Sequence, residues 1–171
     1  MNVLEIKSAF EVDDTGTITG IAWPFGTPDQ AGDIVRKGAF ANATRVPMLW
    51  QHDPAEIIGE WDHLEEAEDG LKVRGQLLID DVARAREAHV LVKKKLLTGL
   101  SIGFRNPVST RRVGARGRVI TGLDLAELSL VTFPSHLGAR ITGAKAAHPA
   151  HLPHEVAEII NAARAALYPA T

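Results

Sequence analysis

The chain has 171 residues, of which 45% are hydrophobic, enough for one domain with a buried core. Its formal net charge of -2 argues against a general nucleic-acid-binding surface, and the absence of cysteine excludes disulfides and thiolate metal sites. No segment reaches the roughly 18 apolar residues that cross a bilayer, and Glu5 and Lys7 interrupt the apolar run that a signal peptide requires. We therefore expect a soluble, cytoplasmic protein.

The first half of the chain predicts β-strands. Alternating apolar residues on either side of the turn DDTG predict a hairpin over residues 3–25. The apolar stretch VPMLWQH, residues 46–52, predicts a further strand. Residues 56–79 predict a second, longer hairpin that turns near Glu68-Asp69-Gly70.

The spacing of the apolar residues then changes to that of a helix, which Asp80 or Asp81 can cap and which ends near Gly99. A strand around SIGFR, a basic loop RNPVSTRRVGARG and a long strand VITGLDLAELSLVTF follow. These elements predict an α+β protein, a small and mostly antiparallel β-barrel with a few packed helices. The predicted helix has an apolar face of Val82, Ala85, His89, Val92 and Leu96.

The composition changes near the end of the chain. The stretch GAKAAHPAHLPH, residues 143–154, predicts a flexible linker, and EVAEIINAARAAL, residues 155–167, predicts a short amphipathic helix. We therefore expect a folded domain over residues 1–142 and a tail over residues 143–171. The three histidines of the linker suit solvent better than a metal ion, so no metal site is predicted.

The stretch LTGLSIGF, residues 97–104, contains the pattern G-x-S-x-G around Ser101. The nucleophile elbow with this pattern requires a strand, a turn and a helix in that order, whereas here the predicted helix precedes the serine and Pro107 follows it. In a strand, Gly99, Ser101 and Gly103 share one face. That face suits close approach of a substrate backbone, or else it marks a barrel bend where glycines relieve crowding.

A serine nucleophile needs a base and a group that orients the base. His52 ends a predicted strand on the face of Trp50, at the rim of the core, a position that also suits a structural histidine. Glu127 interrupts a strand that is apolar on both faces, where a carboxylate must be paired, either with a histidine donor or with an arginine. Asp53 and Asp124 are less well placed carboxylates.

Four stretches together resemble the prohead protease family of tailed phages, the capsid-maturation serine proteases whose fold is similar to that of the herpesvirus assemblins. The resemblance covers most of residues 3–142, and the last three stretches match in order and spacing as well as in residue type. The stretches are GIAWPFGTPDQAGDIVRKGAF, LWQHDPAEIIGEW, LLTGLSIGF and LAELSLVTFPS.

The resemblance implies a serine endopeptidase in which His52 is the base, Ser101 the nucleophile and Glu127 the orienting carboxylate. It implies cleavage of the internal scaffold, and of the protease itself, inside the procapsid in the cytoplasm of a bacterial host. The implied partners are the scaffold segment and the major capsid protein, with an oligomer left open and no nucleic acid, membrane or cofactor. The alternatives are a non-catalytic scaffold-binding or capsid-assembly module on the same fold, and a hydrolase of small esters or amides.

Overall fold

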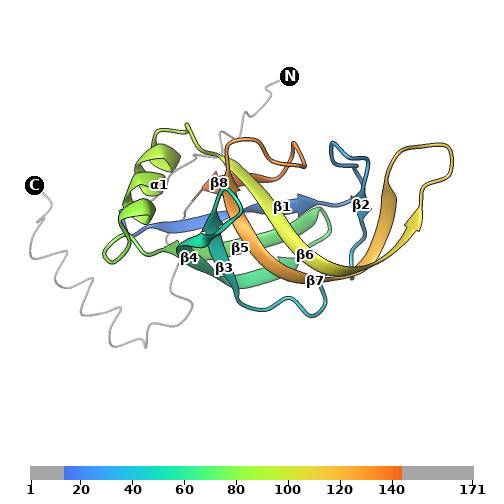
Figure 1. Cartoon of the computed structure of the whole chain (residues 1–171), viewed down its shortest axis with the longest axis horizontal. Helices are drawn as coiled ribbons and strands as arrows, with labels where there is room; N and C mark the ends of the chain where they lie inside the picture. The colour runs from blue at the N-terminus through green and yellow to red at the C-terminus, as the bar shows by residue number, and fades with distance from the viewer. Residues whose placement is uncertain (1–13, 144–171) are drawn as a thin grey trace, which may run out of the picture.

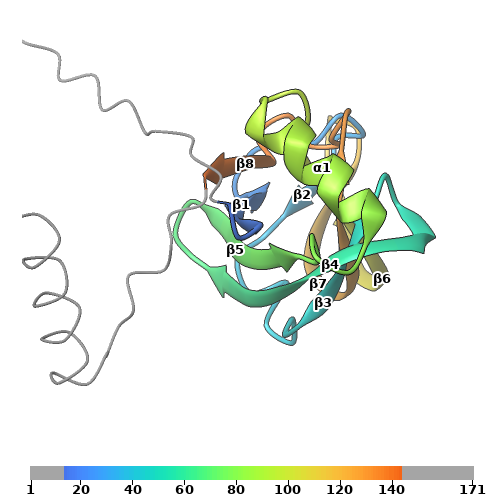
Figure 2. The same cartoon turned by 90° about the vertical axis from the view of Figure 1, so that its left-hand side faces the viewer.

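The structure of the chain, a computed structural model, describes residues 14–143 as a β-barrel with one helix beside it (Figure 1). The helix α1 lies at one end of the barrel, and Figure 2 shows the view onto that end. The elements are β1 Thr17–Pro24, β2 Ile34–Val35, β3 Val46–Trp50, β4 Asp53–Glu66, β5 Gly70–Leu77, α1 Ala83–Lys93, β6 Gly99–Arg111, β7 Arg118–Val131 and β8 Arg140–Gly143.

The strands form one sheet that closes on itself. Their order is β2-β7-β3-β4-β5-β1-β8-β6, and β6 pairs back onto β7, so that every strand except β2 belongs to the closed ring. The pairs β3–β7 and β2–β7 are parallel, and the other pairs are antiparallel. The expected barrel is therefore confirmed, but it is mixed, because β3 and β7 run in the same direction.

The interior of the barrel is apolar, and α1 closes onto it with Ala85, Ala88 and Val92. The Trp61 side chain is fully buried, and its indole N–H donates to the Leu128 carbonyl oxygen at 2.9 Å, so this polar atom is satisfied inside the core. Burial of one large apolar side chain stabilises the fold by about 1.5–3 kcal/mol. The largest buried side chains include Ile18, Met48, Ile58, Leu71, Leu77, Leu100, Ile120, Leu128 and Leu130.

Several predicted elements differ from the observed ones. The second hairpin is confirmed as β4 and β5, whereas residues 3–13 of the first hairpin and the predicted tail beyond Gly143 lie outside the described residues.

Residues 14–143 contain one helix and not several. The predicted cap is wrong, because the residue before α1 is Val82 and no side chain caps it. The predicted apolar face is also partly wrong, since Leu96 follows the helix and is 67% exposed. Among the described residues, α1 is too short and too polar to cross a membrane.

Candidate active site

His52 stands in the tight turn between β3 and β4. Trp50 pairs with Asp53 across this turn, and Gln51 and His52 have positive φ angles of 52° and 62°. Such turns usually hold Gly, Asn or Asp, because most other residues are strained at positive φ by on the order of 1–3 kcal/mol. The predicted position of His52 at the end of a strand, on the face of Trp50, is therefore wrong. The strand β3 ends at Trp50, directly before the turn residues Gln51 and His52.

Four hydrogen bonds hold this strained turn against the end of β7 and against Thr132, the residue that follows it. The Gln51 backbone N–H donates to the Leu130 carbonyl at 3.0 Å. The Gln51 side-chain amide donates to Thr132 Oγ1 at 2.9 Å, and its oxygen accepts from the Thr132 backbone N–H at 3.3 Å. The His52 backbone N–H donates to Ser129 Oγ at 3.2 Å. The position of the imidazole is thus set by β7, the parallel neighbour of β3.

The carboxylate of Glu127 is held at both oxygens. His52 Nδ1 lies 2.7 Å from Glu127 Oε1, and the Ser129 hydroxyl donates to Glu127 Oε2 at 2.6 Å. The Glu127 side chain is 13% exposed and Ser129 is fully buried. The partner of this carboxylate is therefore a histidine, and within residues 14–143 no arginine bridges to it.

The hydrogen bond to Glu127 raises the pKa of His52 above its ordinary value, because the protonated imidazole is the better donor. Partial burial acts in the opposite direction, and the negative charge of Glu127 adds to the rise. The His52 side chain stays 42% exposed, so its other ring nitrogen can exchange protons with a substrate or with water.

Ser101 lies in β6 directly opposite Ser129 of β7, so both side chains are on the same face of the sheet. Gly103 is opposite Glu127, and a Cβ at Gly103 would collide with the Glu127 carboxylate. A Cβ at Gly99 would lie 2.5 Å from the Val131 carbonyl oxygen. The glycines of the G-x-S-x-G pattern therefore make room for β7 and its carboxylate, which favours the crowding interpretation.

The three predicted residues gather around β7. Glu127 belongs to this strand, Ser101 lies on β6 along one edge, and His52 lies in the turn after β3 along the other edge. Ser101 is 4% exposed, and within the described part of the chain its hydroxyl makes no hydrogen bond with His52. Catalytic hydrogen bonds are often long or poorly aligned in sites without substrate.

Other candidate residues lie elsewhere. Asp53 Oδ1 accepts from the Ala55 backbone N–H at 2.9 Å, and Asp124 accepts from the Asn106 amide at 2.8 Å, so neither replaces Glu127 beside His52. His136 is buried with Nε2 3.0 Å from Thr27 Oγ1, in a structural position. The three histidines of the predicted linker lie outside the described residues.

Sequence reasoning did not assign a role to Ser129 or Gln51. Ser129 follows Glu127 by two positions and therefore shares its strand face, which is a readable signal. The role of Gln51 depends on Thr132, a contact between distant parts of the chain that no local pattern indicates.

A serine, a histidine and a carboxylate can act as nucleophile, base and orienting group. These are the three groups of a serine hydrolase site. The chain matches the model of the caudovirus prohead serine protease family over residues 3–153, and it belongs to this family. The resemblance inferred from the four sequence stretches is thereby confirmed.

Two relatives of the chain are phage proteins. It is 34% identical over 137 residues to the prohead protease of Enterobacteria phage HK97, covering 76% of this chain and 60% of that protein. It is 32% identical over 149 residues to the capsid polyprotein of Pseudomonas phage PAJU2, covering 84% of this chain and 22% of that protein. The chain thus spans less than two thirds of the length of either relative.

Two solved structures share the fold. The KSHV protease in complex with a hexapeptide phosphonate inhibitor has a TM-score of 0.50 and 15% identity, covering 73% of this chain and 63% of that chain. The capsid assembly protease of bacteriophage T4 has a TM-score of 0.51 and 11% identity, covering 67% of this chain and 81% of that chain. At these identities the similarity concerns the fold, and it confirms the expected likeness to a herpesvirus protease.

Proposed function

We propose that this chain is a serine endopeptidase of phage capsid maturation, with Ser101 as nucleophile, His52 as base and Glu127 as the carboxylate that orients the base. Membership of the prohead serine protease family supports the reaction class. The observation that carries the residue assignment is the hydrogen bond between His52 and Glu127, on the strand face where Ser101 also lies.

The proposed reaction is acyl transfer. His52 accepts the Ser101 proton on Nε2 while Oγ attacks the peptide carbonyl carbon, and the Nδ1–H donates to Glu127. The imidazolium then returns the proton to the leaving amine, so the peptide bond breaks and an ester on Ser101 remains. Water, deprotonated by His52, hydrolyses this ester and restores the hydroxyl. Ser129 is a positioning residue, since it contacts both Glu127 and the His52 turn.

The proposed substrates are the internal scaffold segment and the protease itself, cleaved inside the procapsid in the bacterial host. The HK97 relative is named a prohead protease and the PAJU2 relative a capsid polyprotein, which supports partners among the scaffold and the major capsid protein. The proposed protease domain is residues 1–142, extended by one residue to Gly143, where β8 ends, and the proposed linker and short helix follow it.

The test is cleavage of a co-expressed scaffold protein by the wild-type chain, by Ser101→Ala and by His52→Ala. Either substitution is expected to lower turnover by on the order of 10⁶, because base and nucleophile act as one unit. Thr44→Ala is the control, since it removes an exposed hydroxyl in the loop before β3, and this variant is expected to cleave the scaffold normally.

Two outcomes contradict the proposal in different ways. Scaffold that binds the wild-type chain but stays intact, together with no reaction of Ser101 with a fluorophosphonate probe, indicates a non-catalytic assembly module. Reaction with the probe and turnover of small esters, without scaffold cleavage, indicates an esterase or amidase.

A further inference from the structure

The end of the β6–β7 hairpin is strongly basic. Residues 105–118, called the arginine hairpin below, contain five arginines and no acidic residue. Because the chain has 19 basic and 21 acidic residues, the rest of it carries 14 basic against the same 21 acidic ones. The hairpin extends from the barrel at the end opposite α1 (Figure 1). The arginines are Arg105, Arg111, Arg112, Arg116 and Arg118.

Two of these arginines fix the hairpin in place. Arg118 Nη2 donates to Asp33 Oδ2 at 2.6 Å, and its backbone N–H donates to Asp33 Oδ1 at 2.8 Å. The hydrogen bonds from Arg118 hold the pKa of Asp33 below its ordinary value. Arg112 Nη1 donates to the carbonyl oxygens of Gly32 at 2.8 Å and of Arg116 at 3.1 Å. The hairpin is therefore anchored before any partner arrives.

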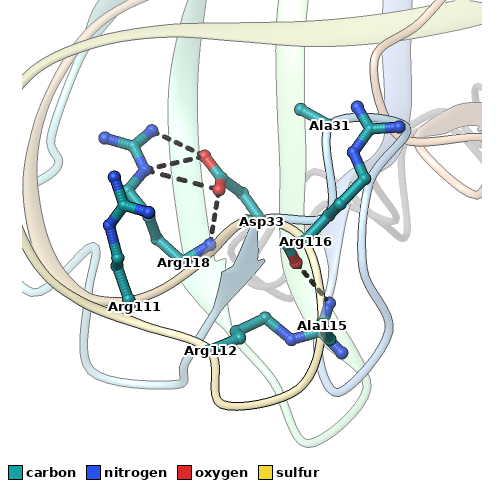
Figure 3. A pocket seen from close by; sticks show the side chains of 8 residues that line it. Ala31, Asp33, Arg111, Arg112, Ala115, Arg116 and Arg118 are labelled. Atoms are coloured by element: carbon teal, nitrogen blue, oxygen red, sulfur yellow. Dashed lines mark hydrogen bonds and ion pairs between the residues drawn. The ribbon is translucent and has the colours of Figure 1, made fainter.

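Two other arginines are not used by the fold. Arg111 and Arg116 line the same cavity of about 610 Å³, together with the small residues Ala31, Ala115 and Gly117 (Figure 3). Both are exposed, and within residues 14–143 neither side chain has a hydrogen bond or an ion pair. Their guanidinium groups are thus available to an anionic partner at the rim of a preformed cavity.

We propose that the arginine hairpin is a docking surface for an acidic segment of a partner protein, whose carboxylates pair with Arg111 and Arg116. A planar guanidinium binds a carboxylate through two parallel hydrogen bonds, and arginine is enriched at protein interfaces. The turn also presents Val113, which is fully exposed at 101%, so the surface offers an apolar contact between the charged ones.

A protein segment fits this surface better than nucleic acid. The hairpin carries a net positive charge and the rest of the chain a net negative one, so a long polyanion would be repelled along most of its length. A short acidic segment meets only the hairpin. The proposal does not require peptidase activity.

Binding is tested by fluorescence anisotropy on full-length chains that carry Ser101→Ala, so that no probe can be cleaved. The probes are a short labelled peptide with pairs of glutamates between leucines, its glutamine counterpart, and a single-stranded oligonucleotide of equal charge. The test variant is Arg111→Gln with Arg116→Gln. The control is Lys94→Gln with Lys95→Gln, which removes the same charge beside α1 at the other end of the molecule.

We expect the acidic peptide to bind, the arginine variant to weaken this binding at least about tenfold, and the lysine variant to change it less than about twofold. Added salt should weaken binding, because exposed ion pairs are screened. As a second arm, Arg111→Glu with Arg116→Glu should bind a lysine-rich version of the peptide. The proposal is overturned by equal binding of the glutamine peptide, by tighter arginine-dependent binding of the oligonucleotide, or by no peptide binding.

Discussion

At the scale of single residues, Glu127 sets the proton affinity of the proposed base. The pKa of His52 is raised above its ordinary value of about 6.5 by the hydrogen bond to Glu127. Because the base must be neutral, kcat/KM should rise with pH through an acid limb whose midpoint lies above that ordinary value. Glu127→Gln should move this midpoint down and lower turnover by roughly 10²–10⁴.

The measurement is a pH–rate profile of scaffold-peptide cleavage for the wild type, Glu127→Gln and the control Thr44→Ala. If Glu127→Gln keeps both the acid-limb midpoint and the turnover of the wild type, Glu127 has a structural role only. Glutamine keeps the volume and can still bond to the Ser129 hydroxyl, so the melting transition is expected to survive.

Ser129 supports the proposed site through its hydrogen bonds to Glu127 and to the His52 turn. Ser129→Ala removes the donor to Glu127 Oε2 and the acceptor for the His52 backbone N–H, both in a fully buried position. We expect a loss of about 1–3 kcal/mol in the free energy of unfolding. We also expect a lower kcat with little change in KM, and a shifted acid limb, because the base is no longer held. A loss of stability with kcat and pH profile intact would assign Ser129 a structural role only.

Glycine is required at position 103 to leave space for the Glu127 carboxylate. A Cβ at this position would collide with the Glu127 carboxylate, so Gly103→Ala should displace the carboxylate and lower kcat. The matched control is Gly122→Ala on β7, where a Cβ would meet only the Val108 side chain at an ordinary 3.6 Å. Steady-state kinetics on both variants decides the point, and equal activity of the two would contradict it.

At the scale of elements, strand alternation predicted one half of the site correctly. It placed Gly99, Ser101 and Gly103 on a common face, and the register with β7 confirms this. It also placed a carboxylate on a buried strand in need of a partner. These features were readable because they depend on the period of a strand and the cost of burying a charge.

The other half of the site, the turn that carries His52, depends on contacts between residues far apart in the sequence. The residue types of Gln51 and His52 do not indicate a tight turn with positive φ, because the turn is held by distant residues. Thr132 donates its backbone N–H to the Gln51 side chain, and Ser129 Oγ accepts from the His52 backbone N–H. The parallel pairing of β3 with β7 is equally non-local, which is why chain-neighbour reasoning expected a mostly antiparallel barrel.

The strain in this turn can be measured directly. His52→Gly and His52→Ala both lack the imidazole and should both be inactive, but glycine tolerates the φ of 62° and alanine does not. The free energy of unfolding of His52→Gly, measured by thermal melting, should therefore be about 1 kcal/mol higher than that of His52→Ala. Equal stability of the two variants would mean that the turn relaxes and stores no strain.

At the scale of the whole molecule, β8 extends to Gly143, one residue beyond the expected domain boundary at 142. The family match continues to residue 153. We expect a chain that ends at Gly143 to keep the melting transition and the cleavage activity of the full chain, because the barrel is already closed there. Loss of both, with recovery in a chain that ends at residue 153, would place the intervening residues inside the folded unit.

The parallel contact between β3 and β7 has a consequence for timing. The β6–β7 hairpin brings Ser101 and Glu127 together from neighbouring stretches of sequence, whereas His52 reaches them only when β3 docks against β7, across a separation of 75 residues. Non-local pairings of this kind form late, because the entropy of closing a long loop must be lost first. We therefore expect a freshly synthesised chain to pass through a period in which the proposed nucleophile and the proposed base are apart, so that the folding rate delays the onset of the proposed proteolysis.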